Sequence, residues 1–211
     1  MPELCKPPGS DCRSGAYNTA MFKPPMASLL PLLCFAVPLL HADDTVASDP
    51  SVQQASAYCA STGGQVYWRR ATYGTNGPGA LPLAAMRPFC QYTSATDGSR
   101  IHILLSTLYA TQPTLAALAY YAQEQASGGG GGNPASYYCT QLGGSDLFGG
   151  VTAAGGGWVN NSSTDQTLEA CIFPDMSSID SWGLDYHSVN IIRGIDLSTV
   201  LRYANPYAVK K

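Results

Sequence analysis

The sequence predicts an α+β fold made of two tandem small domains, each ordered helix, antiparallel strands, helix, and each closed by a disulfide. A pattern that occurs twice leads to this prediction: Tyr-Cys, then Gly-Gly, then a second cysteine. It is found at Tyr58-Cys59, Gly63-Gly64 and Cys90, and again at Tyr138-Cys139, Gly143-Gly144 and Cys171. Nearly equal spacing in both occurrences indicates two copies of one unit.

The first 42 residues are expected to be an upstream segment followed by a secretory leader. An apolar run at 29–40 follows Lys23 and precedes the small residue Ala42. This order is typical of a cleaved signal peptide, and the run is too short to span a bilayer. We therefore expect an exported mature chain, in the periplasm or outside the cell. Cys34 lies inside the run rather than after small residues, so a lipid anchor is less favoured.

Removal of the leader leaves four of the seven cysteines, two in each copy. Four cysteines allow three pairings. The duplication favours Cys59–Cys90 and Cys139–Cys171, since each copy should carry its own bond. The sequence contains no Cys-x-x-Cys, and metal clusters require closer spacing, so we expect neither a metal site nor a cofactor.

The two domains are predicted at 43–127 and 133–211. The run Gly128–Gly132 lies between them and reads as a linker that lets the domains reorient.

Each domain is predicted to begin with a short helix. Asp49 and Asn133 are good N-caps, and each precedes a proline, which is tolerated at the first helical position. Gly63 and Gly143 suit the left-handed residue that ends a helix. The first cysteine of each copy therefore lies late on a helix.

Strands and further helices are expected to follow. Val66–Trp68 reads as a strand, and a second strand in each copy carries Cys90 or Cys171. After a turn, the apolar spacing becomes helical. The residues with this spacing are Ile101, Leu104, Leu105 and Leu108 in the first copy, and Ile179, Trp182 and Tyr186 in the second. A last helix is predicted after Thr114 and after Asp196.

The charge pattern bears on possible partners. The mature chain has eight Lys and Arg against twelve Asp and Glu, and it has no basic stripe. Nucleic acid is therefore not an expected partner. No mature segment has the length for a transmembrane span. The expected partner is a protein or another envelope component.

Five residues are candidates for a binding surface. Trp158 lies among glycines, with little obvious core to join, and an aromatic on a mobile loop is a common binding device. Trp68 and Tyr73, beside Arg69 and Arg70, form a second candidate. Trp182, Tyr186 and Phe173 are instead expected in the core.

A group of acids and a histidine offers an alternative site. Asp175, Asp180, Asp185 and His187 lie close in sequence, and such residues can perform acid–base chemistry or bind a hard cation. Asp175 fits a turn, where an aspartate hydrogen-bonds to its own backbone, and needs no catalytic role. The other two acids fit the solvent-exposed face of a helix, so we favour the structural interpretation. No catalytic residue is therefore assigned.

Part of the chain resembles a known family. The residues are Asn133-Pro134-Ala135-Ser136, Tyr138-Cys139, Gly143-Gly144, Cys171-Ile172-Phe173-Pro174-Asp175 and Ile179-Asp180-Ser181-Trp182. They are similar to a bacterial cell-envelope domain family of unknown function that carries the label "hemolysin". The first copy keeps fewer of these elements and has Leu104 where Trp182 is expected. The resemblance implies an envelope location, and it implies no mechanism.

Three function classes follow. The favoured one is an exported, non-enzymatic binding or adaptor module of the cell envelope. A membrane-active, hemolysin-like protein is the first alternative, and a hydrolase or cation site at Asp175, Asp180, Asp185 and His187 is the second.

Overall fold

The computed structural model describes residues 49–127, 132–146, 155–160 and 163–208. The predicted leader and most of the glycine linker lie outside the described residues. We call the described part up to residue 127 the N-terminal half, and the part from residue 132 the C-terminal half.

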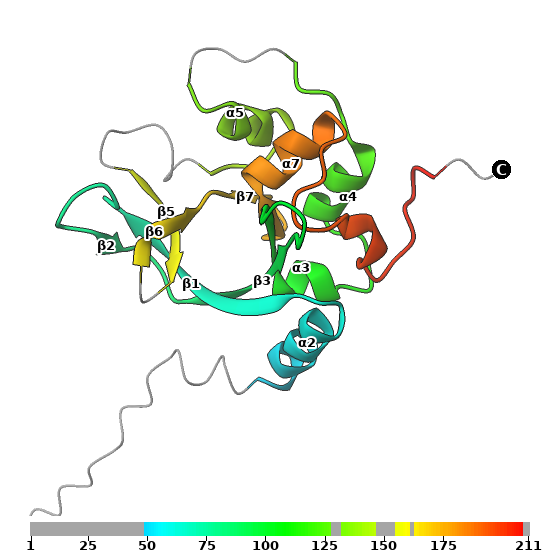
Figure 1. The fold of residues 1–211 in the computed structure, drawn as a ribbon, viewed down its shortest axis with the longest axis horizontal. Helices are drawn as coiled ribbons and strands as arrows, with labels where there is room; N and C mark the ends of the chain where they lie inside the picture. The colour runs from blue at the N-terminus through cyan, green and yellow to red at the C-terminus, as the bar shows by residue number, and fades with distance from the viewer. Residues whose placement is uncertain (1–48, 128–131, 147–154, 161–162, 209–211) are drawn as a thin grey trace, which may run out of the picture. The chain divides into compact units, whose positions relative to one another are not determined.

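Strands from both halves form one antiparallel sheet (Figure 1). The strands are β1 (Gln65–Tyr73), β2 (Leu81–Pro82), β3 (Arg87–Thr93), β4 (Arg100–Leu104), β5 (Gly156–Asn160), β6 (Ser163–Leu168), β7 (Ala170–Ile172) and β8 (Ser178–Asp180). Their order across the sheet is β6-β5-β1-β3-β4-β8-β7, and β2 pairs with the end of β1. Strands of the C-terminal half thus flank those of the N-terminal half on both sides. The predicted α+β class is confirmed, whereas the arrangement as two tandem domains is not.

The helices and the main core lie on one face of this sheet. The helices are α2 (Pro50–Ser61), α3 (Leu105–Tyr109), α4 (Leu115–Ala122), α5 (Pro134–Gln141), α7 (Ser181–Ser188) and the 3-10 turn η1 (Leu197–Thr199). Figure 1 shows α4, α5 and α7 grouped together, away from the β5–β6 pair. Cys90, Ile103 and Ile179 point from the strands into a core that includes side chains of all these helices. The core therefore draws on both halves.

Local signals place the first helix of each half. The Asp49 carboxylate accepts from Ser51 N at 2.8 Å, and Asn133 Oδ1 accepts from Ala135 N at 3.0 Å. Each capping residue is followed by a proline, as predicted.

The Gly-Gly pairs have two separate roles. Gly63 and Gly143 adopt φ of 89° and 84°, a left-handed conformation that follows the helix end. Gly64 and Gly144 instead lie against the disulfides. A Cβ on Gly64 would be 2.8 Å from Cys59 Sγ and closer still to Cys90 Sγ, and one on Gly144 would meet the other bond similarly. The second glycine of each pair therefore makes room for the bond.

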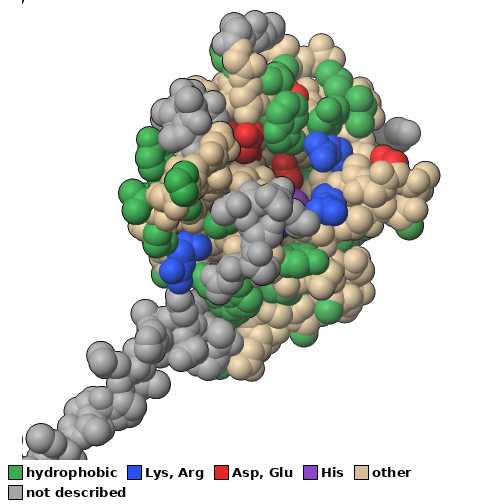
Figure 2. Space-filling view, turned by 60° about the vertical axis from the view of Figure 1, so that its left-hand side comes forward, with side chains coloured by type: hydrophobic (Ala, Val, Ile, Leu, Met, Phe, Trp, Pro, Cys, Tyr) green, Lys and Arg blue, Asp and Glu red, His purple; other side chains and the backbone are tan. Residues whose placement is uncertain are grey.

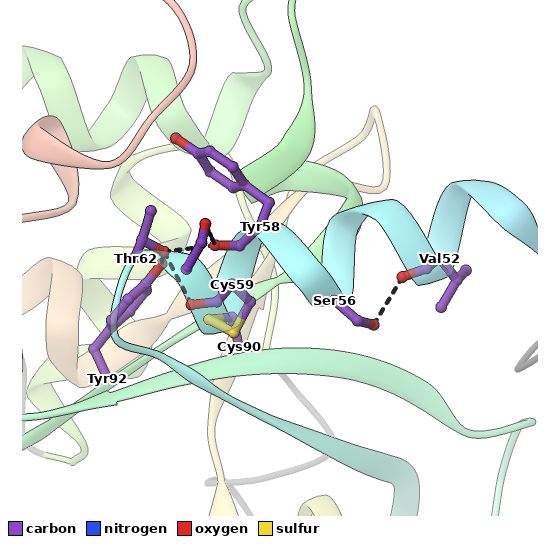
Figure 3. Close-up of a disulfide and its surroundings, with 8 residues drawn as sticks. Val52, Ser56, Tyr58, Cys59, Thr62, Cys90 and Tyr92 are labelled. Carbon is purple, nitrogen blue, oxygen red and sulfur yellow. Dashed lines mark hydrogen bonds between the residues drawn. A yellow bond between two sulfur atoms is a disulfide. The ribbon is translucent and has the colours of Figure 1, made fainter.

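Both predicted disulfides are confirmed. Cys59 is joined to Cys90, and Cys139 to Cys171. Figure 3 shows Thr62 and Tyr92 beside the first bond, with Thr62 Oγ1 2.7 Å from the Tyr92 hydroxyl. Each bond fastens a helix end to the sheet.

The predicted helix over Ile101–Leu108 is wrong in its first part. Residues 100–104 form strand β4, and only 105–109 are helical. Ile101 and Ile103 alternate toward the core, and pairing with β3 and β8 fixes the extended form. Likewise Ile179 is in a strand, although Trp182 and Tyr186 are in α7. Of the last helices, α4 forms as predicted, while its counterpart is only the turn η1.

Contacts between the halves interlock them. Ile103 of β4 pairs with Ile179 of β8 at the junction. The Tyr58 hydroxyl donates to Val200 O at 2.7 Å, and the Tyr138 hydroxyl donates to Glu124 O. Each tyrosine thus reaches the end of the other half, and the described residues all belong to one compact unit.

Candidate functional site: a polar pocket on the sheet

A row of polar side chains crosses the sheet on the face away from the helices. Successive residues of a strand point to opposite faces. Because Cys90, Ile103 and Ile179 face the helices, their neighbours Gln91, His102 and Asp180 face the other side. Gln91 pairs with His102 across β3 and β4, and the Ile103–Ile179 register sets His102 opposite Asp180.

His102 is the centre of this row. Its Nδ1 donates to Asp180 Oδ2 at 2.8 Å, across the junction between the halves. Its Nε2 lies 2.9 Å from Gln91 Oε1 and 3.3 Å from an Arg69 guanidinium nitrogen. The other Asp180 oxygen accepts from Gly183 N at 3.0 Å and so caps α7. Both ring nitrogens of His102 and both carboxylate oxygens of Asp180 therefore have protein partners.

Arg69 brings a cation into the interior. It lies on β1, its side chain is 1% exposed, and it donates to Trp158 O at 3.3 Å. Burial lowers the pKa of Arg69, and the negative charge of Asp180 opposes that shift. Burial of a charge is unfavourable unless it is compensated, so this arginine needs Asp180 or another anion nearby.

Arg69 and two residues of the row, His102 and Asp180, are buried and form the floor of a pocket of about 230 Å³. The pocket is also lined by Arg100, Arg193, Glu169 and Trp182. Figure 2 shows acidic, basic and histidine side chains gathered on one face of the molecule. The Glu169 carboxylate accepts from Asn133 Nδ2 at 2.6 Å. Among the described lining residues, both acids thus have donors already, and three are arginines.

The same sheet contains an apolar counterpart of this pocket. The antiparallel register that places His102 opposite Asp180 places Leu104 opposite Ser178, on the other side of the Ile103–Ile179 pair. There Phe89, Leu104 and Trp158 leave a cavity of only about 20 Å³. The same sheet geometry is thus compatible with a closely packed apolar cluster. The polar, open pocket at His102 and Asp180 therefore results from the side chains there and not from the sheet alone.

Of the five predicted binding residues, only Arg69 lines the polar pocket. Trp158 is 4% exposed and packs edge-on against Phe89, with ring centroids 5.3 Å apart, so it is a core residue rather than an exposed contact. Trp68 and Arg70 alternate with Arg69 and point to the opposite face. Tyr73 is 40% exposed at the end of β1.

The four residues of the predicted acid cluster do not come together. Asp175 accepts from Leu115 N at 2.8 Å and from Ser177 N in its turn, as the structural interpretation expects. Asp180 is in the polar pocket, and burial raises the pKa of Asp185 on α7. His187 stacks on Tyr120 instead. Among the described residues, no group of three His, Cys, Asp or Glu could hold a metal ion.

Sequence reasoning missed the partnership of His102 with Asp180, because the two are 78 residues apart. One signal was present. His102 stands between Ile101 and Ile103, and a lone polar residue in an apolar alternation marks the other face of a strand.

Comparison with known family models, curated proteins and solved structures finds no match for this chain. None of the helices in the described ranges combines the length and apolar character needed to cross a bilayer.

Proposed function

We propose that this chain is an exported, non-enzymatic binding module of the cell envelope, and that the polar pocket recognises an oxyanion group on an envelope component. The group is a carboxylate or a phosphate. The observation that carries the proposal is the convergence of Arg69, Arg100 and Arg193 on one small pocket.

The charges of the pocket favour an anion. Arginine donates in a planar fork that matches carboxylate and phosphate oxygens. Arg69 lies on the floor, and Arg100 and Arg193 approach from β4 and from the segment after α7. Both oxygens of Asp180 and Oε2 of Glu169 already accept protein donors. Because the described lining has three arginines and these two acids, an added oxyanion would complement the excess of positive charge. Trp182 supplies an aromatic wall for the apolar part of the ligand.

The hydrogen bonds of His102 favour binding over catalysis. A general base must reach the proton that it removes. Both ring nitrogens of His102 are occupied by Asp180, Gln91 and Arg69. The His102–Asp180 pair therefore serves to orient Arg69 and to balance its charge.

Two further points support an exported module. Disulfides persist in oxidising compartments, and this chain contains two. The resemblance to an envelope family agrees with that location. We also propose that the halves are copies of one unit that became a single body, since each half has a capped helix, a Gly-Gly pair and a disulfide at corresponding places.

Titration with inorganic phosphate and with acetate tests the pocket. We expect saturable binding by calorimetry and a rise in melting temperature, because a ligand that binds only the folded state stabilises it. Arg193→Gln and Arg100→Gln should each weaken binding about tenfold, since a charge-assisted hydrogen bond contributes roughly 1.5–3 kcal/mol.

Arg70→Gln is the matched control, because Arg70 follows Arg69 on β1, points to the opposite face of the sheet and does not line the polar pocket. It should bind both anions like the unchanged protein. Equal weakening in all three variants would indicate general charge screening and would contradict the proposal, as would the absence of saturable binding.

A further inference from the structure

A second cavity lies between α2, α3 and the start of β3. Its volume is about 690 Å³, within the roughly 300–1,000 Å³ range of small-molecule sites. None of the described residues lines both this cavity and the polar pocket. The two sites are therefore separate.

The lining of this cavity is mainly apolar and includes several alanines. Ala55, Leu104 and Leu105 are buried side chains that form its inner part. Ala84 and Ala85 form an outer wall. Short side chains leave this space open, where larger ones would fill it.

The charged residues at this cavity are both cationic. Arg87 and Arg202 are exposed and line it, and none of the acidic residues that the structure describes does. The Arg202 guanidinium lies 4.0 Å from the Tyr109 ring centroid, and its Nη1 donates to Tyr109 O at 2.8 Å. These contacts hold a positive charge at the edge of an apolar space.

We infer that this cavity binds a single-chain amphiphile with an anionic head, of the long-chain carboxylate class. The chain occupies the apolar interior, where its burial from water is favourable. The carboxylate meets Arg87 and Arg202 at the edge, where arginine matches its two oxygens. A neutral amphiphile would gain the first interaction only, and a short carboxylate only the second.

Calorimetric titration with dodecanoate, dodecanol and acetate tests this inference on the disulfide-bonded protein. Dodecanoate should bind saturably below its micelle concentration, and dodecanol at least tenfold more weakly. Acetate, which lacks the apolar chain, should not displace bound dodecanoate at equal concentration. Absence of saturable dodecanoate binding, or equal binding of dodecanol, overturns the inference.

Variants locate the site. Ala84→Trp places a large side chain in the cavity from an exposed position and should abolish dodecanoate binding while the melting temperature is kept. Arg202→Gln should weaken dodecanoate binding about tenfold, because one charge-assisted contact is lost. Arg193→Gln in the polar pocket is the control and should leave dodecanoate binding unchanged when acetate fills the polar pocket. Dodecanoate binding that is lost in Arg193→Gln but kept in Ala84→Trp would overturn the inference and assign the carboxylate to the polar pocket.

Discussion

At the scale of single residues, Trp158 shows how a sequence neighbourhood differs from a structural one. Its glycine neighbours indicate an exposed loop, yet β5 carries it into a cluster with Phe89, Leu104 and Leu168. Gly157 has φ of 146°, and a Cβ there would be 2.9 Å from Leu168 O. The glycines therefore allow close approach between β5 and β6 rather than mobility.

Trp158→Ala should accordingly lower the free energy of unfolding by about 3–5 kcal/mol, the usual effect of removing a large buried aromatic. Urea denaturation followed by circular dichroism measures this change. Trp68→Ala is the comparison, because Trp68 is only half-buried and should have a smaller effect. If Trp158→Ala leaves the free energy of unfolding unchanged, Trp158 is not a core residue and the prediction that it is a binding contact is restored.

At the scale of elements, the sequence predicted what local interactions determine. Asp49 and Asn133 mark helix starts because a cap depends on residues within one turn. The disulfide pairing followed from the matched spacing of Tyr58-Cys59 and Tyr138-Cys139. The strand at Ile101–Leu104 was missed because its apolar spacing also fits a helix, and pairing with β3 and β8 decides between them. The polar pocket was missed because His102 and Asp180 meet only through the pairing of β4 with the distant β8.

Packing between helices α4 and α7 predicts a dependence of stability on pH. The His187 ring stacks on Tyr120 with centroids 3.8 Å apart. Burial lowers the pKa of His187, and the charge of Asp196 partly opposes this. The unfolded chain therefore takes up a proton more readily than the folded one as pH falls below about 6.5. The contribution of neutral, buried His187 to the free energy of unfolding is therefore complete above about pH 6.5. It is lost as the pH falls below that value toward the lower pKa of the folded state.

We therefore expect the free energy of unfolding to decrease between about pH 6.5 and 5, and His187→Phe to reduce the slope. Phenylalanine keeps an aromatic ring against Tyr120 and removes the titrating group. Denaturation curves at a series of pH values compare the two proteins. An identical slope in both would assign the pH dependence to other groups.

At the scale of the whole described unit, each half depends on the other for its sheet and its core. Strand β4 has β8 as a neighbour, and β1 has β5. Removal of one half would expose these strand edges to water and would uncover core residues such as Ile103, Ile179 and Tyr138. The polar pocket would be lost as well, because His102 and Asp180 come from different halves.

We predict that the fragments 43–127 and 133–211 will each lack a cooperative thermal transition when produced alone, whereas the intact chain unfolds in a single transition. The sharper comparison is a chain with a protease site inserted in the predicted linker at 128–132 and cleaved after folding. Because the Ile103–Ile179 pairing, the Tyr58–Val200 bond and the Tyr138–Glu124 bond do not depend on the linker, the cleaved halves should elute together from a sizing column. They should also keep phosphate binding in the polar pocket. A fragment that folds cooperatively by itself, or cleaved halves that separate under native conditions, would establish two independent domains and place the function within one of them.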